Sequence, residues 1–509
     1  MQLGQLELER RAIQSFDRLY SASTIKDENA DIIVSDSYPD ILRIIDARGL
    51  ICLKEKRCTE SGVELIGAVH VSVLYAPEDD EAPRRLSLTI PYQHLFERRG
   101  LNADAKVIAS VSLTAVHART INPRKVAVGV TFALDVKCYA PAKLDVCSGV
   151  KVYTSTGLET LTKTVEIHTP SAICDKAFTL TDQIELPSGR PQIAGVLHAD
   201  VRLLPREIKA VGTKAVLKAA AILSVLYTSE SGEIATWEQE VPFSQIIELG
   251  GDAIGDGAAL YASLTLNGLD LGLETPSRVV DVELSVEAQI IAVSQSRVDL
   301  LSDAYSTKYH ILPETREVGL LNISDAFAVR AQIREARQLS PVPHSVIDTK
   351  VALSPVGFGS VLTAQAHVSV LYIADDGGYA TGAFTLPVES EAFETPYDPN
   401  GSVAAAYVSG DVFSGLSSDG LEVRFNVAFE GYRCDDRYMT VIDDVKGDWE
   451  NPREGGGASV TLRRVREGER LWEIAKSCGA SSADILAANS LTDGAEPDAG
   501  TLLLIPRSR

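Results

Sequence analysis

In three stretches of the chain, large apolar residues alternate with small or polar residues. The apolar residues occupy every second position from Val126 to Val136, from Val280 to Val286 and from Leu421 to Phe429. Successive side chains of a strand point to opposite faces, so this pattern predicts strands with one buried face. Each run follows a turn signal rich in Asn, Pro, Asp or Gly. We therefore expect each strand to form a long antiparallel hairpin with the strand before it.

A short apolar sequence that ends in tyrosine recurs once in each third of the chain. The residues Ser-Val-Leu-Tyr end at Tyr75, Tyr227 and Tyr372, and a proline follows each tyrosine after 16, 15 and 15 residues. Upstream, Pro39 and Pro191 each stand 36 residues before their tyrosine. Repetition of both signals predicts three copies of one β-rich unit.

These signals place three antiparallel, sandwich-like repeats in series. They are expected at residues 28–142, 170–296 and 318–435. The third copy has Ala336 at the position where the other two have proline. Its first strand is therefore expected to diverge from the other copies.

The remaining segments predict smaller elements. Within residues 1–27, the apolar residues from Leu6 to Tyr20 are compatible with one amphipathic helix. Residues 450–458 contain three consecutive glycines and are expected to form a linker. Residues 459–507 predict a small βααβ module. The predicted fold class is mainly β, with three tandem repeats followed by this module.

The C-terminal segment resembles a LysM domain. The residues that carry the resemblance are Val465, Gly468, Glu469, Leu471, Ile474, Ala475, Ile485, Asn489, Leu491, Gly500, Leu503, Ile505 and Pro506. LysM modules typically bind N-acetylglucosamine-containing glycans between the first strand–helix loop and the second helix–strand loop. The resemblance implies a binding groove formed by Gly468, Glu469, Arg470, Leu471, Asn489, Ser490 and Leu491.

Because of two departures from the LysM pattern, the sequence does not decide which class of ligand the module binds. Arg470 stands where threonine is usual, and Cys478 stands where an aromatic residue commonly closes the first helix. A long arginine alters a groove that needs short polar groups beside a flat apolar floor. Both a glycan and a protein remain candidate ligands, and Trp472 is expected in the core of the module.

The three repeats resemble the SPOCS domain of endospore-forming bacteria. Residues 34–45, Val-Ser-Asp-Ser-Tyr-Pro-Asp-Ile-Leu-Arg-Ile-Ile, and the Val-Leu-Tyr strands carry this resemblance. SPOCS copies followed by a LysM domain are similar to the SipL-type spore coat morphogenetic proteins. The resemblance implies a protein of the mother-cell cytoplasm, at the forespore surface. There it would link the coat-base ATPase (stage IV sporulation protein A) to other coat proteins.

The charge distribution narrows the choice of partners. The formal net charge of −22 lies in the first 457 residues, because residues 458–509 carry seven basic and seven acidic side chains. Such an acidic body repels polyanions, which argues against nucleic acid and anionic membranes as partners. The sequence starts without a signal-peptide pattern, and no apolar stretch approaches about 18 residues. We therefore expect a cytosolic protein without a membrane span.

The sequence has no motif of a catalytic or metal site. It lacks HExxH, GxSxG and a phosphate-binding loop, and its seven cysteines show no CxxC spacing. We therefore expect no enzyme activity, cofactor or bound metal. Together with this absence, the resemblance to SPOCS and LysM proteins implies a non-enzymatic spore coat scaffold with the LysM module as its docking surface. The alternative is a peptidoglycan-binding protein anchored through that module.

Overall fold

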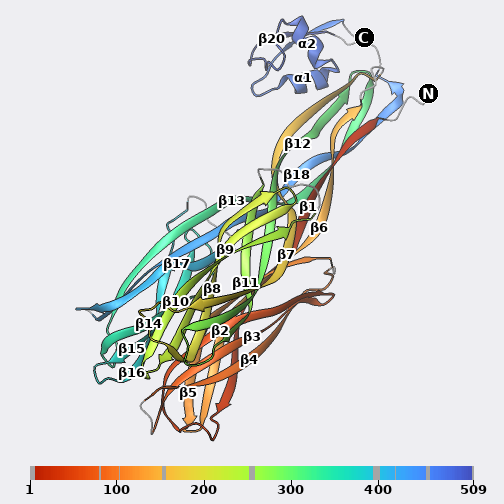
Figure 1. Cartoon of the computed structure of the whole chain (residues 1–509). Helices are drawn as coiled ribbons and strands as arrows, with labels where there is room; N and C mark the ends of the chain where they lie inside the picture. Colours follow the sequence, from red (N-terminus) through yellow and green to blue (C-terminus); the bar gives the residue numbers. More distant parts are fainter. Residues whose placement is uncertain are drawn as a thin grey trace.

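The computed structural model describes residues 6–78, 82–101, 104–151, 156–250, 258–393, 402–418, 420–453 and 459–506. Within these residues, eighteen strands form six three-stranded antiparallel sheets, and the C-terminal module adds a two-stranded sheet and two short helices (Figure 1). The predicted fold class, mainly β with a terminal βααβ module, is confirmed.

The eighteen strands form three units of six strands with one topology. Unit 1 contains β1 (Glu7–Ile33), β2 (Ile41–Thr59), β3 (Gly62–Pro77), β4 (Arg84–Glu97), β5 (Lys106–Asn122) and β6 (Lys125–Lys151). Unit 2 contains β7 (Leu158–Glu185), β8 (Ile193–Val211), β9 (Lys214–Ser229), β10 (Ile234–Glu248), β11 (Ala259–Gly272) and β12 (Val279–Ser306). Unit 3 contains β13 (Tyr309–Arg337), β14 (Pro343–Leu353), β15 (Thr363–Ala374), β16 (Tyr379–Glu389), β17 (Ser402–Ser417) and β18 (Gly420–Pro452). In every unit, strands two to four form one sheet, and strand six lies between strands one and five in the other.

The three alternating runs lie in β6, β12 and β18, the central strands of their sheets. Their apolar residues, among them Val126, Phe132, Val280 and Phe429, are buried in the unit cores. Each central strand pairs with the strand before it in the antiparallel sense. The predicted hairpins are confirmed.

The repeated tyrosine ties the third strand of a unit to the loop before its second strand. Tyr75 and Tyr227 have no exposed surface. Their hydroxyls donate hydrogen bonds to the carbonyl oxygens of Pro39 and Pro191, both at 3.3 Å. The recurrent spacing in the sequence therefore reflects one buried contact.

In unit 3, the same contact involves a proline that the spacing did not identify. The hydroxyl of Tyr372 donates to the carbonyl oxygen of Pro341 at 2.9 Å. Ala336, the residue expected at this position, lies within β13 opposite Glu422. The following strand β14 has 11 residues, whereas β2 and β8 have 19 each. The divergence of the third copy is a shorter strand, which brings the proline closer to the tyrosine in sequence.

The predicted N-terminal helix within residues 1–27 is wrong. Residues 7–33 form β1, which pairs with β6 from Glu7 opposite Lys151 to Ile33 opposite Lys125. A few apolar residues at helical spacing are a weak local signal, and hydrogen bonding to a 27-residue partner strand overrides it. Residues 1–5 lie outside the described residues.

The outer ends of the longest strands continue as a stalk. Two-stranded ribbons of β1 with β6, β7 with β12, and β13 with β18 lie side by side (Figure 1). Ile13, Val146, Val165, Val298 and Val441 from the three ribbons form one buried cluster. The stalk is therefore built by all three units together.

The units are longer than the predicted repeats, whose boundaries fall inside the stalk strands. The units extend over residues 7–151, 158–306 and 309–452. Of the predicted linker at residues 450–458, residues 450–452 end β18. Residues 454–458 lie outside the described residues.

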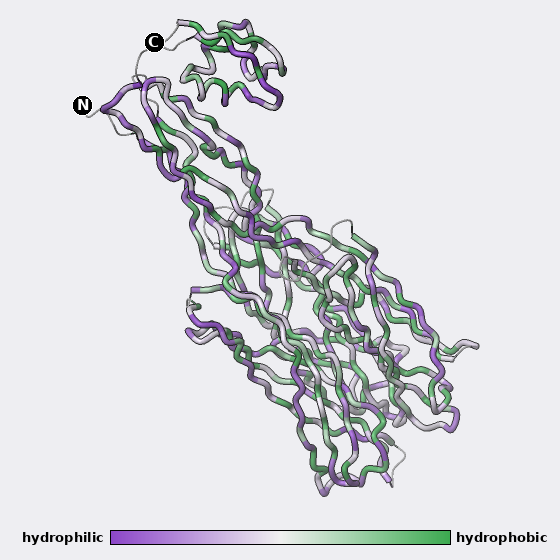
Figure 2. Tube along the Cα trace, turned by 180° about the vertical axis from the view of Figure 1, so that it is seen from behind, coloured by the Kyte–Doolittle hydropathy of each residue, from purple (hydrophilic) through white to green (hydrophobic). Residues whose placement is uncertain are grey.

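The three units lie side by side at the end of the stalk and do not form a string (Figure 1), and Figure 2 shows the same broad body and narrower stalk from behind. Units 1 and 2 share a polar contact around Gln289 of β12, which is 1% exposed. Its amide nitrogen donates to the carbonyl oxygen of Ala109 at 2.8 Å, and its oxygen accepts from the backbone N–H of Ala109 at 2.8 Å. The polar face of β12 is thus partly an interface between units.

Candidate functional site

The C-terminal module has the predicted order of elements. It contains β19 (Val460–Arg464), α1 (Leu471–Cys478), α2 (Ser482–Ala488) and β20 (Leu502–Pro506). Its core residues include Val465, Leu471, Ile474, Ala475, Ile485, Leu503 and Ile505. Helix α1 ends at Gly479, whose φ of 62° is left-handed and is favourable for a residue without a Cβ atom.

The two loops of the predicted groove meet at the start of α1. The backbone N–H of Leu471 donates a 2.8 Å hydrogen bond to the carboxylate of Glu496, which lies in the loop before β20. The carboxylate of Glu473 accepts from the backbone N–H of Arg470 at 3.4 Å. Both carboxylates stabilise N–H groups at the positive end of the helix. Sequence reasoning missed Glu496, because a single loop carboxylate has no recognisable spacing.

Glu469 is engaged within its own loop. Its carboxylate accepts from the backbone N–H of Arg466 at 3.1 Å and pairs with the guanidinium of Arg463. These two contacts hold the pKa of Glu469 below its usual range. The preceding Gly468 has a φ of 74°, which lets the chain turn into this loop.

Asn489 joins the end of α2 to β20. Its amide nitrogen donates to the carbonyl oxygens of Ile485 at 2.8 Å and Leu504 at 2.7 Å. Its amide oxygen accepts from the backbone N–H of Leu504 at 2.8 Å. Ser490 follows with an exposed side chain, and Leu491 packs against the module core.

The seven predicted groove residues therefore lie on two loops of one module. The polar groups of Glu469 and Asn489 are satisfied internally, and Leu471 is buried. Arg470 and Ser490 present exposed side chains. The groove itself remains a prediction, and a ligand that needs the N–H of Leu471 must displace Glu496.

The module packs against the tip of the stalk. Tyr305 near the end of β12 is 2% exposed and belongs to the same apolar cluster as the module core. Its ring meets that of Trp472 nearly edge to face, with centroids 4.8 Å apart. Its hydroxyl donates to the carbonyl oxygen of Ala480 at 2.8 Å. Trp472 therefore joins the module to the body of the protein.

A carboxylate strengthens this contact. Asp303 accepts from the indole N–H of Trp472 at 2.8 Å and from the ammonium of Lys476 at 2.7 Å. Burial disfavours the ionised form, but these bonds outweigh it and lower the pKa of Asp303. Burial raises the pKa of Tyr305 to about 12, so its hydroxyl stays a donor at neutral pH. Neither residue was identified from sequence, since their partners lie some 170 positions away.

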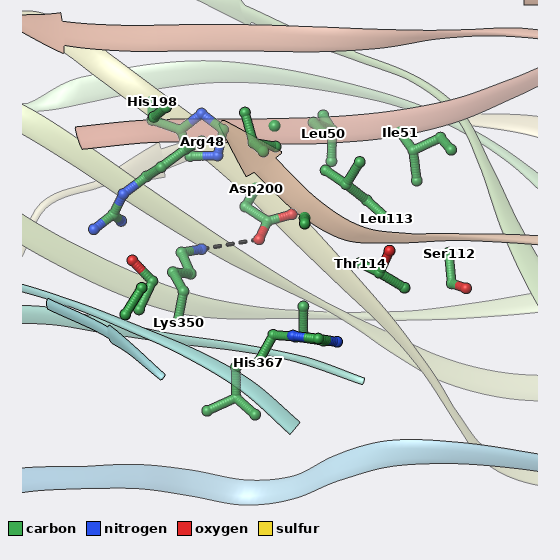
Figure 3. A pocket seen from close by; sticks show the side chains of 18 of the residues that line it. Arg48, Leu50, Ile51, Ser112, Leu113, Thr114, His198, Asp200, Lys350 and His367 are labelled. Carbon is green, nitrogen blue, oxygen red and sulfur yellow. Dashed lines mark hydrogen bonds and ion pairs between the residues drawn. The ribbon is translucent and has the colours of Figure 1, made fainter. Parts of the chain in front are cut away.

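A second candidate site is a cavity of about 870 Å³ among the three units (Figure 3). Lys350 of β14 and Asp200 of β8 form a 2.9 Å ion pair in its wall. Arg48 of β2 pairs with Asp46 at 2.6 Å and with Asp348 of β14. These pairs connect unit 3 to both other units.

The charged residues come from equivalent positions of the three units. One set follows a β-bulge in the second strand of each unit: Asp46, His198 and Asp348. The other set stands two residues later: Arg48, Asp200 and Lys350. Burial lowers the pKa of His198 to about 3. The Lys350 ammonium overcomes the effect of burial and lowers the pKa of Asp200 to about 2.

Nowhere in the described ranges do three His, Cys, Asp or Glu side chains come together in a way that could hold a metal ion. The helices of the same ranges include none that is long and apolar enough to span a membrane.

Comparison with known proteins identifies one domain. Residues 464–506 match the model of the LysM domain family. No curated protein and no solved structure matches the chain. The LysM resemblance is thus confirmed for the C-terminal module and makes glycan binding a candidate function. The resemblance of the three β units to the SPOCS domain stays a prediction.

Proposed function

We propose that this chain is a non-enzymatic scaffold of the spore coat. It links the coat-base ATPase layer on the forespore surface to the assembling coat, and the LysM module is its docking surface. The observation that carries this proposal is the elongated shape, with three interlocked β units at one end and the module packed on the stalk at the other (Figure 1). Such a molecule holds two contacts at a fixed separation.

The assignment to the spore coat rests on the resemblance of residues 34–45 and of the Val-Leu-Tyr strands to SPOCS proteins. The proposed partners are an ATPase of the stage IV sporulation protein A type and other coat proteins, in the mother-cell cytoplasm. The net charge of −22 favours basic protein surfaces among them. Several weak contacts on one rigid molecule would add up to firm attachment.

A second candidate function is binding of peptidoglycan or another N-acetylglucosamine-containing glycan. The LysM match over residues 464–506 favours it. The internal bonds of Glu469 and Asn489, and the carboxylate of Glu496 at the N–H of Leu471, leave few free polar groups for a sugar. These internal bonds favour docking of a protein over binding of a glycan.

The test uses the full chain, because Tyr305 of the stalk is part of the module core. The protein is mixed with immobilised coat-base ATPase and, separately, with purified spore peptidoglycan beside a glycan-binding LysM control. We expect saturable binding to the ATPase and recovery of the protein in the supernatant of the peptidoglycan sample. Pelleting with peptidoglycan that chito-oligosaccharide reverses, without binding to the ATPase, would establish the second function instead.

A further inference from the structure

The outer face of the two-stranded sheet in the LysM module is apolar and uncovered. Val460, Leu462, Leu502 and Leu504 are 48%, 60%, 55% and 42% exposed. The described residues contain eighteen exposed large apolar side chains, and four of them lie on these two five-residue strands. A contiguous apolar patch of this kind on a soluble domain marks an interaction site.

The four side chains share one face because of the pairing of the strands. Leu462 lies opposite Leu504, and the intervening residues of β20 point to the other side. Leu503 and Ile505 on that other side are 1% and 3% exposed and pack against the helices. The core of the module is therefore complete without the outer residues.

The free edge of the sheet can be located from one hydrogen-bond pattern. Both the N–H and the C=O of Leu504 bond to the side chain of Asn489, so they point away from β19. Opposite residues in an antiparallel pair exchange either both bonds or none. The N–H and C=O of Leu462 therefore point to the outer edge of β19, where no strand of the described residues pairs.

The charge on this face indicates the kind of segment that it accepts. Arg464 stands on the outer face opposite Leu502, beside the apolar residues. Residues 458–509 have no net charge, whereas the rest of the chain carries −22. An acidic segment is therefore repelled by the body but not by the module.

We propose that the outer edge of β19 accepts an extended, acidic strand of the coat-base ATPase. The added strand places apolar side chains over Leu462 and Leu504 and a carboxylate against Arg464, as in strand addition to a sheet edge. This inference rests on the proposed function and names the surface of the module that performs the docking. The glycan groove is a different surface, formed by the two loops.

The experiment measures the dissociation constant of the full chain for the coat-base ATPase. Leu462→Pro removes the outward N–H, and proline is tolerated on an edge strand where that group faces solvent. Leu504→Glu places a charge on the face without touching the edge. We expect each variant to raise the dissociation constant at least about tenfold, as loss of an interface anchor does. Ile246→Glu, which changes a 56% exposed residue on β10, is the matched control and should bind as wild type does.

Leu462→Pro could unfold the module, so Arg464→Glu is a second variant on the same surface. It reverses an exposed charge and leaves the core of the module intact. It should weaken binding to a similar extent. Wild-type affinity in both Leu504→Glu and Arg464→Glu would overturn the inference while the proposed function stands. Absence of binding by the wild-type chain would overturn the proposed function together with the inference. A wild-type dimer in light scattering that Leu462→Pro converts to monomer would assign the edge to a second copy and contradict a strand of the ATPase.

Discussion

Gln289 shows how a residue at a polar position of an alternating strand becomes an interface residue. The pattern in β12 assigns it to the exposed face, yet unit 1 covers it and its exposed fraction is 1%. Besides the backbone of Ala109, its amide bonds the hydroxyl of Thr265 at 3.0 Å. The cost of burying the amide is offset because each polar atom has a partner.

Gln289→Ala is expected to destabilise the protein, because it leaves the buried backbone N–H of Ala109 without an acceptor, while the carbonyl oxygen of Ala109 keeps the hydroxyl of Thr265. An unsatisfied buried group of this kind costs about 1–3 kcal/mol. The measurement is urea-induced unfolding followed by tryptophan fluorescence. Gln295→Ala on the exposed face of the same strand is the control and should change stability by less than about 0.5 kcal/mol. Equal unfolding midpoints for the two variants would contradict the role of Gln289.

His198 makes stability depend on pH. The residue is 4% exposed and faces Arg48, Lys350, Asp200 and Asp348, and burial is the largest cause of its lowered pKa of about 3. In the unfolded chain the imidazole binds a proton near pH 6.5. Below that pH the unfolded state holds one proton more than the folded state, so acidification favours unfolding.

Because of this proton uptake by His198, we predict that the free energy of unfolding falls by about 1.4 kcal/mol per pH unit as the pH is lowered from 6 to 4.5. Above pH 6.5 the contribution of the neutral His198 to the free energy of unfolding is fully present. This contribution is lost as the pH falls toward 3. His198→Gln removes the titrating group and keeps a polar partner for Ser72. Denaturant titrations at several pH values should show a smaller slope in this variant. An unchanged slope would exclude His198 as the cause.

At the scale of elements, local sequence patterns predicted the strands correctly where the apolar face of the strand packs against residues of the same unit. The alternating residues of β6, β12 and β18 and the tyrosines at 75, 227 and 372 are of this kind. The N-terminal segment was misassigned, because its partner β6 lies more than 90 residues away and outweighs a weak helical spacing. Pro341 was missed because a shortened strand changed the spacing.

The candidate site also contains features that the sequence predicted and residues that it did not. The LysM pattern predicted the two helices and both loops, since it is read within fewer than 50 residues. Asp303 and Tyr305 could not be found, because nothing in β12 distinguishes them from other strand residues until the module packs on them. Long-range packing, which a local pattern cannot encode, decided the position of the module.

Tyr305→Ala is predicted to release the module from the stalk. Removing a buried aromatic side chain costs about 3–5 kcal/mol at the site. Hydrogen exchange of the amides in α1 should accelerate, while exchange in β2 to β4 stays unchanged. Tyr438→Ala, which truncates a 66% exposed residue of the same stalk, is the control and should leave exchange in α1 as in wild type. Slow exchange of α1 in both variants would contradict packing of the module on the stalk.

At the scale of the whole molecule, three units and one module form a single elongated body. Ion pairs hold the three units together at one end of this body, and they involve Arg48, Asp46, Asp348, Lys350 and Asp200. The contact of the module with Asp303 and Tyr305 fixes the other end. A scaffold that joins two layers needs such a fixed distance, whereas a module on a loose tether would not define one.

The most direct test of this account is the distance between the module and the stalk, measured by double electron–electron resonance in the full chain. One spin label is placed on Cys478, the exposed cysteine of α1, and the other on Leu161→Cys in β7, with half-buried Cys58 and Cys174 replaced by Ser. The account predicts one narrow distance distribution that broadens when Tyr305→Ala is added. A broad distribution in the protein that retains Tyr305 would show a tethered module and contradict the rigid scaffold.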